Sequence, residues 1–315
     1  QPGTQSKAFF GRYKYRSDVM SAGMLDGRGG AKDETDPVFD RPIFIVSAPR
    51  SGSTLLFEVL SKVRDIYTIG GESHQMIEQV PGLRPRDRGF DSNALSVIDA
   101  TPERTQQLRD HFHAALHDSE GRRPSAGARV RMLEKTPKNA LRIEFLAHVF
   151  PESRFVFLHR DARETVGSMI DAWRSGNFRT YPGLPQWPQL PWSLLLVPGW
   201  RELASKPLHE VVSTQWKTTM ECLLDSLDGL PQERWCALDY TEFLADPSAR
   251  LQALCKALGL SWENELSGPL PWSRYTLTPP ARDKWRKHGA SIESVLPQLQ
   301  PTMERANRML KQGAV

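Results

Sequence analysis

Short apolar segments recur along the chain, and segments with helical spacing of apolar residues follow most of them. The apolar segments comprise residues 43–46, 66–69, 130–133, 154–158 and 235–238. Segments with helical spacing comprise residues 55–63, 138–149, 163–173 and 247–258. A short apolar run without a polar face is typical of a parallel strand covered on both sides. The alternation predicts an α/β fold, with a mostly parallel sheet of about five strands flanked by helices.

We divide the chain into an N-terminal arm and one domain with an inserted segment, according to where the alternation of strands and helices begins and breaks. Residues 1–40 are polar and rich in glycine, so we interpret them as an irregular N-terminal arm. Residues 41–315 are interpreted as one domain, which an amphipathic helix at 293–310 closes. A segment rich in Trp and Pro interrupts the pattern, and we interpret residues 174–207 as a lid over a ligand site. Burial of the same aromatic residues in the core is the alternative.

Composition narrows the functional classes. The chain is 39% hydrophobic and 25% charged, as expected for a folded globular protein. A net charge of +4 suits an anionic ligand but is too small for the basic stripe of a nucleic-acid binder. The longest apolar run, Trp192–Pro198, is too short to span a membrane, and the three cysteines show no paired spacing. We therefore expect a cytoplasmic protein that has no membrane span and binds no nucleic acid, with its oligomeric state open.

The segment Ser47–Leu56 joins the first predicted strand to the first predicted helix. Its central residues are Arg50, Ser51, Gly52, Ser53 and Thr54. Glycine and small hydroxyl residues allow successive backbone N–H groups to converge on an anion at a helix N-terminus, and an arginine adds a cation. The segment therefore predicts a phosphate-binding loop. An ordinary Ser-Gly turn with a serine N-cap is the alternative.

The spacing of this loop differs from the Walker A loop of nucleotide triphosphatases. A Gly-x-x-x-x-Gly-Lys-Ser/Thr frame placed on Gly52 puts Ser47 at the first glycine and Ser53 at the lysine. Transfer of a γ-phosphoryl group requires that lysine together with Mg²⁺. A P-loop nucleotide kinase is therefore a weaker interpretation, and a non-catalytic nucleotide-binding domain is a second alternative.

Two segments together resemble the donor site of a known enzyme family. Pro49–Leu56 is similar to the 5′-phosphosulfate loop of sulfotransferases that use 3′-phosphoadenosine 5′-phosphosulfate (PAPS). Arg160 ends a predicted strand and Ser168 follows on the next helix, as in the family's 3′-phosphate site, although Ala162 replaces the usual proline. The resemblance implies a P-loop-like sulfotransferase fold, PAPS as co-substrate, 3′-phosphoadenosine 5′-phosphate (PAP) as product and no metal. A plain ion pair of Arg160 with a neighbouring carboxylate is the alternative.

Weaker matches extend the resemblance toward the C-terminus. Tyr240 follows the last predicted strand, in a segment similar to one that lies near the nucleotide in these enzymes. A basic segment resembles the family's C-terminal loop, which implies an aromatic ring near adenine and cations near the 3′-phosphate. The implied binding residues are Trp285, Arg286 and Lys287. A buried tyrosine and a solvated charged run are the respective alternatives.

Candidate catalytic residues follow the second and third predicted strands. Glu72 lies in a Gly-Gly-Glu-Ser-His segment similar to one that holds the catalytic base in branches of the family acting on sugars or tyrosine. His74 is the competing base, because histidine needs less tuning of its pKa. Lys135 lies in a Lys-Thr-Pro segment that resembles carbohydrate sulfotransferases, which implies stabilisation of the leaving group. A helix-capping Glu72 and a surface Lys135 are the alternatives.

His111, His113 and His117 have helical spacing but no Cys or acidic partner, so no metal site is predicted.

The chemical class of the acceptor is predicted from the Trp- and Pro-rich segment. Residues 181–200 contain no Asp, Asn or His, which a polyhydroxyl acceptor would require nearby. We therefore expect a small-molecule or carrier-bound acceptor that is phenolic, lipid-like or polyketide-like. A carbohydrate acceptor is the alternative.

Overall fold

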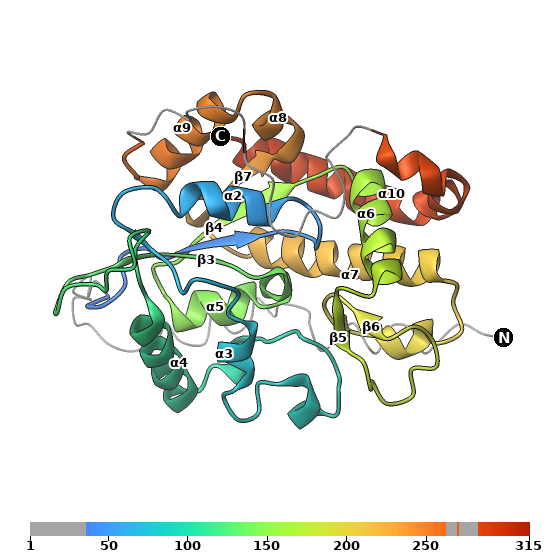
Figure 1. The fold of residues 1–315 in the computed structure, drawn as a ribbon, viewed down its shortest axis with the longest axis horizontal. Coiled ribbons are helices and arrows are strands. Elements are labelled where there is room, and N and C mark those ends of the chain that lie inside the picture. Colours follow the sequence, from blue (N-terminus) through green and yellow to red (C-terminus); the bar gives the residue numbers. More distant parts are fainter. Residues whose placement is uncertain (1–35, 263–269, 271–282) are drawn as a thin grey trace, which may run out of the picture. The chain divides into compact units, whose positions relative to one another are not determined.

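The computed structural model describes residues 36–262, 270 and 283–315, so most of the predicted N-terminal arm lies outside the described residues. Their main sheet has five parallel strands in the order β2-β3-β1-β4-β7. The strands are β1 (Ile43–Val46), β2 (Ile66–Tyr67), β3 (Arg131–Lys135), β4 (Arg154–His159) and β7 (Trp235–Asp239). The predicted α/β fold is confirmed, and β3 begins and ends later than its predicted segment (Figure 1).

Helices follow the strands and cover both faces of the sheet (Figure 1). They are α2 (Ser53–Leu60), α3 (His74–Glu78), α4 (Pro102–Ala115), α5 (Ile143–Val149), α6 (Ala162–Ser175), α7 (Leu208–Asp228), α8 (Tyr240–Ala245), α9 (Pro247–Leu258) and α10 (Gly289–Gly313). The helix predicted at 138–149 is divided, because a 3₁₀ turn over Pro137–Leu141 precedes α5. The predicted closing helix is present as the longer α10.

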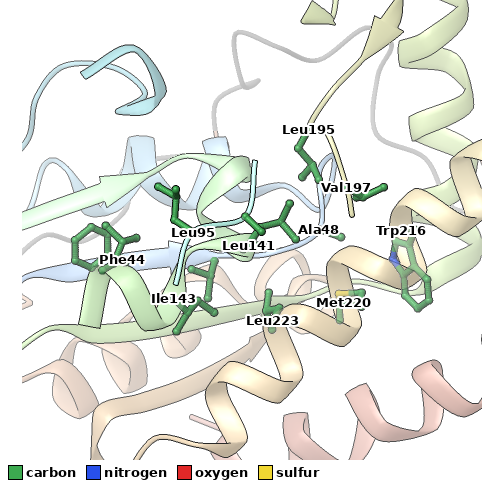
Figure 2. Close-up of a cluster of buried hydrophobic side chains, with 14 of the residues drawn as sticks. Phe44, Ala48, Leu95, Leu141, Ile143, Leu195, Val197, Trp216, Met220 and Leu223 are labelled. Carbon is green, nitrogen blue, oxygen red and sulfur yellow. The ribbon is translucent and has the colours of Figure 1, made fainter. Parts of the chain in front are cut away.

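Alternate residues of the central strands pack into two separate apolar layers. Phe44 and Phe155 face the layer formed with α5, α7 and α10, whereas Ile45 and Val156 face the layer formed with α2, α8 and α9. Figure 2 shows part of the first layer, where Phe44 and Leu223 lie in one cluster. Burial on both faces explains why the strand segments have no polar face.

The Trp- and Pro-rich segment contributes to the first apolar layer. It contains β5 (Arg179–Tyr181) and β6 (Trp192–Ser193), which pair in antiparallel fashion. The Trp192 and Trp200 rings are fully buried and meet edge to face, with centroids 5.8 Å apart. Each indole N–H donates to a backbone carbonyl, of Leu195 and Phe90 respectively. These two rings are therefore core residues, and the lid interpretation of residues 174–207 stays a prediction.

Candidate active site

The loop after β1 turns sharply before α2 begins at Ser53. Arg50 and Gly52 both adopt the left-handed conformation, with φ of 69° and 94°. A Cβ at position 52 would lie 2.1 Å from Cε2 of Tyr240, so only glycine permits the tyrosine ring to pack on this loop. Gly52 is also the N-cap residue, which leaves the first turn of α2 without a side-chain cap. No serine side chain caps α2, so the N–H groups of its first turn are suited to an anion, while an ordinary turn stays the alternative.

A cavity of about 500 Å³ lies at the carboxyl ends of the strands. The predicted site residues that line it are Arg50, Gly52, Ser53, Thr54, Glu72, His74, Arg160, Ser168, Tyr240 and Trp285. Ser51 and Lys135 are buried next to this lining, whereas Arg286 and Lys287 are exposed and lie outside it. Most residues singled out in the sequence therefore meet in one cavity, although they come from distant segments.

Arg50 and Arg160 lie side by side at the centre of this cavity. The Arg160 guanidinium donates from Nη1 to the backbone carbonyl of Arg50 at 2.8 Å, and it also pairs with Glu164 at 3.5 Å. Nε of Arg50 lies 3.5 Å from Oγ of Ser168, and its guanidinium stacks 4.6 Å from the centre of the Phe178 ring. Burial, together with the positive charge of Arg160, lowers the pKa of Arg50. An anion bound beside these cations would offset the repulsion between them.

In the C-terminal basic segment, Lys284 and Trp285 line the same cavity, whereas Arg286 and Lys287 do not. Trp285, in the 3₁₀ helix Lys284–His288, packs against Gly167 of α6, where a Cβ would lie 3.1 Å from the tryptophan Cα. Lys287 instead pairs with Asp171 at 2.6 Å. Trp285 therefore lines the cavity, while its place near adenine and the contact of Arg286 and Lys287 with a 3′-phosphate stay predictions.

Glu72 forms the centre of a charged group on the other side of the cavity. Its Oε1 accepts from Nζ of Lys135 at 2.6 Å, and its Oε2 lies 3.6 Å from Nδ1 of His74. Burial alone would raise the pKa of Glu72, but His74 and Lys135 outweigh it and lower that pKa to about 2. Glu72 is therefore ionised at neutral pH, and the two competing base candidates contact each other.

The segment that carries Glu72 is held by a buried carboxylate that the sequence reasoning missed. Glu134 is fully buried, and its Oε1 accepts from the backbone N–H of Ser73 and from Oγ1 of Thr136. Its Oε2 accepts from Nδ2 of Asn139 at 2.7 Å. Burial raises the pKa of Glu134. These contacts fix the position of Glu72 relative to the end of β3, and the Glu-Lys-Thr-Pro motif was the available signal.

A second missed cluster surrounds Lys138, which lines the cavity. Its Nζ lies 2.7 Å from Oε1 of Glu78, and the same oxygen accepts from the buried Arg142 at 2.9 Å. Lys138 also donates to the Tyr181 hydroxyl at 3.2 Å, so this lysine connects Glu78 of α3 to Tyr181 of β5.

Within the described part of the chain, no group of His, Cys, Asp and Glu side chains is arranged to hold a metal ion.

The chain belongs to the sulfotransferase family, because it matches that family over residues 42–264. It is 20% identical over 226 residues to protein-tyrosine sulfotransferase A of Caenorhabditis elegans, which covers 71% of this chain and 51% of that protein. It is 26% identical over 133 residues to a putative protein-tyrosine sulfotransferase of Caenorhabditis briggsae, covering 42% and 44%. The chain thus spans about half the length of the curated relatives it matches.

Solved structures of other sulfotransferases are also similar to this chain. The sulfotransferase from Alicyclobacillus acidocaldarius has a TM-score of 0.48 and 15% identity, covering 87% of this chain and 97% of that one. Mouse sulfotransferase SULT7A1, solved in complex with PAP, has a TM-score of 0.48 and 16% identity, covering 88% and 91%. The family prediction is confirmed by the sequence match, independently of these distant structures.

Among the described residues, no helix is both long enough and apolar enough to span a membrane.

Proposed function

We propose that the chain transfers the sulfuryl group of PAPS to a hydroxyl or amine of an acceptor and releases PAP. The observation that carries this proposal is the single cavity lined by the Gly52 loop, by Arg160 with Ser168, and by Glu72. Membership of the sulfotransferase family supports the same activity. A donor site and a candidate base in one cavity are what group transfer between two bound substrates requires.

The proposed donor site uses the loop for the 5′ side and α6 for the 3′ side. Arg50 and residues 51–54 would bind the 5′-phosphosulfate through N–H groups, hydroxyls and one guanidinium. Arg160 and Ser168 would bind the 3′-phosphate, supported by their shared place in the lining of the cavity. Tyr240 and Trp285 would pack on the nucleoside, with Arg286 and Lys287 as further cations.

The proposed chemistry is an in-line displacement at sulfur. The bond between sulfur and the bridging oxygen of PAPS breaks, the acceptor oxygen bonds to sulfur, and Glu72 takes the acceptor proton. Its contact with Lys135 keeps Glu72 ionised but also weakens it as a base. A shift of the Lys135 ammonium toward the developing negative charge on the leaving phosphate would stabilise that charge. The same shift would make Glu72 more basic.

An apolar hydroxyl acceptor is proposed for the remaining part of the cavity. Phe178, Leu194, Leu195 and Pro137 line it together with Glu72. Apolar walls around a few polar groups are typical of sites for small organic molecules. A phenolic, lipid-like or polyketide-like hydroxyl fits this lining, and a carbohydrate is the alternative that an acceptor panel must include.

Thermal unfolding and a transfer assay test the proposal together. PAP at micromolar concentration should raise the Tm, and adenosine 5′-phosphate should raise it much less. Sulfate from labelled PAPS should then appear on a member of a panel of phenols, sterols, sugars, peptides and carrier-bound hydroxyls. Stabilisation by ATP with Mg²⁺ but not by PAP would indicate a nucleotide kinase. Binding of PAP without consumption of PAPS would indicate a non-catalytic domain.

A further inference from the structure

The order of the strands divides the cavity into two halves. Residues that follow β1, β4 and β7 line one half, and they include the Gly52 loop, Arg160 and Tyr240. Residues that follow β2 and β3, on the other side of β1, line the second half, and they include Glu72 and Lys138. Phe178 and Arg179 also line the cavity, where the Phe178 ring lies 4.6 Å from the Arg50 guanidinium, and Tyr181 of β5 accepts from Lys138 of the second half. The first half is the proposed donor site, so the second half is left for the acceptor.

Charged side chains of both signs lie in or beside the second half, with Lys135, Lys138 and Arg142 close to Glu72, Glu78 and the buried Glu134. Glu72 is ionised and accepts from Lys135. The single carboxylate of Glu78 is shared between Lys138 and Arg142, whose charges it cannot both neutralise. Burial lowers the pKa of Lys138, as expected for a cation with an incomplete counter-charge. Lys138, which lines the cavity and shares its carboxylate with Arg142, is therefore a cation that an acidic ligand group could approach.

Arg179 adds a further cation to the lining of the cavity. The residue is exposed and lines the cavity, and no carboxylate of residues 36–262 or 283–315 forms an ion pair with it. Its guanidinium lies over Gly176, where a Cβ would be 2.8 Å from Nη2. Gly176 ends α6 in the left-handed conformation and leaves room for the guanidinium there. Arg179 thus lines the cavity with its guanidinium at the end of α6, and it directly follows Phe178 in the chain.

We propose, on the basis of the sulfuryl-transfer function above, that the natural acceptor carries an acidic group that pairs with Arg179. Its apolar body would pack on Phe178 and Leu195, and its hydroxyl would reach Glu72. The substrate class is then a hydroxy acid with an aromatic or aliphatic body, instead of a neutral phenol or sterol. A favourable interaction of Arg179 with the C-terminal end of α6 is the competing role, and it would affect stability without affecting acceptor choice.

Two acceptor probes of matched size test this assignment. Para-hydroxyphenylpropionate and its primary amide differ only in the negative charge, so KM for each is measured with saturating PAPS. The wild-type protein should prefer the acid, and R179Q should raise KM for the acid about tenfold while changing that for the amide much less. R179K should recover part of the preference. R174Q is the matched control, because Arg174 is exposed on α6 and does not line the cavity.

Each outcome of this experiment decides the assignment. Equal KM values for acid and amide in the wild-type protein would overturn it. An equal loss with both probes in R179Q, accompanied by a lower Tm, would assign Arg179 to the stability of α6 instead. If neither probe accepts sulfate, calorimetry with PAP-loaded protein replaces the assay, and failure of the acid to bind more tightly than the amide overturns the proposal. Failure of the sulfotransferase function itself would be seen separately, as equal Tm shifts with PAP and adenosine 5′-phosphate.

Discussion

Nζ of Lys135 lies 2.6 Å from Oε1 of Glu72, although 63 residues separate the two in the chain. Lys135 is at the end of β3 and its side chain is almost completely buried, whereas Glu72 lines the cavity. A base held in this ion pair is fully ionised at neutral pH. Its reactivity then depends on how strongly the lysine interacts with it at each stage of the reaction.

Substitution of the proposed base should reduce turnover without affecting donor binding. Glu72→Gln preserves size but cannot accept a proton, so kcat should fall by roughly 10² or more. The Kd for PAP, measured by calorimetry, should change little. His74→Ala is the comparison, because His74 contacts Glu72 and also lines the cavity. A severe loss in His74→Ala with a mild loss in Glu72→Gln would reverse the assignment.

The ion pair also predicts a change in pH dependence. His74 and Lys135 lower the pKa of Glu72 to about 2, against the opposite effect of burial. Lys135→Met removes one of the lowering contacts while burial remains, so the pKa of Glu72 must rise. Glu72 then becomes protonated at a higher pH than in the wild-type protein, and the acidic limb of kcat/KM should move upward. Lys311→Met, an exposed change on α10, is the control, and identical limbs in all three proteins would contradict the prediction.

Loss of the Arg160 side chain should weaken nucleotide binding in a way that depends on the 3′-phosphate. Arg160→Ala should cost about 1.5–3 kcal/mol in PAP binding, the range for a lost charge-assisted contact. The affinity for adenosine 5′-phosphate should change much less. Arg64→Ala, at an exposed position, controls for the loss of a positive charge. Unchanged PAP affinity would mean that Arg160 serves its contacts within the protein, with Glu164, the Arg50 carbonyl and the Tyr240 ring, and not the nucleotide.

The close approach of Tyr240 to the loop makes Gly52 a sensitive position. Gly52→Ala places a side chain at φ 94°, which costs roughly 1–3 kcal/mol, and it also forces the Tyr240 ring to move. The Tm and the affinity for PAP should therefore fall together. Gly183→Ala is the control, because no atom lies within 4 Å of a Cβ there. Normal PAP binding by Gly52→Ala would show that the loop geometry is not needed for the donor.

Sequence pattern predicted the sheet because each central strand has to be apolar on both faces. Phe44 and Ile45 point into different layers, so neither position tolerates a polar residue. The site was predicted where a motif lies directly after a strand, as for Arg50, Glu72 and Arg160. Lys138 and Arg142 were missed because their environment depends on Glu78 and Tyr181, which are distant in sequence. No local pattern encodes such contacts.

The Trp- and Pro-rich segment could not be divided between core and lid from its composition. Trp192 and Phe178 are both aromatic and close in sequence, yet only Phe178 lines the cavity. The difference arises because the Trp192 indole has an internal partner, the carbonyl of Leu195, and packs among other tryptophan rings. These contacts depend on the pairing of β5 with β6, which is an irregular pair with a register shift.

Because Trp192 is a core residue and Phe178 lines the cavity, substitutions of these two residues should affect different properties, stability in one case and acceptor binding in the other. Trp192→Ala removes a fully buried ring and should lower the free energy of unfolding by about 3–5 kcal/mol. Phe178→Ala removes a half-buried ring of the cavity wall, so it should raise the acceptor KM several-fold while the Tm changes little. The binding free energy of PAP should weaken by no more than about 1 kcal/mol, because Arg50 loses its contact with the Phe178 ring. Chemical denaturation and acceptor kinetics on the two variants check this, and the prediction fails if Phe178→Ala leaves KM unchanged for every acceptor of the panel.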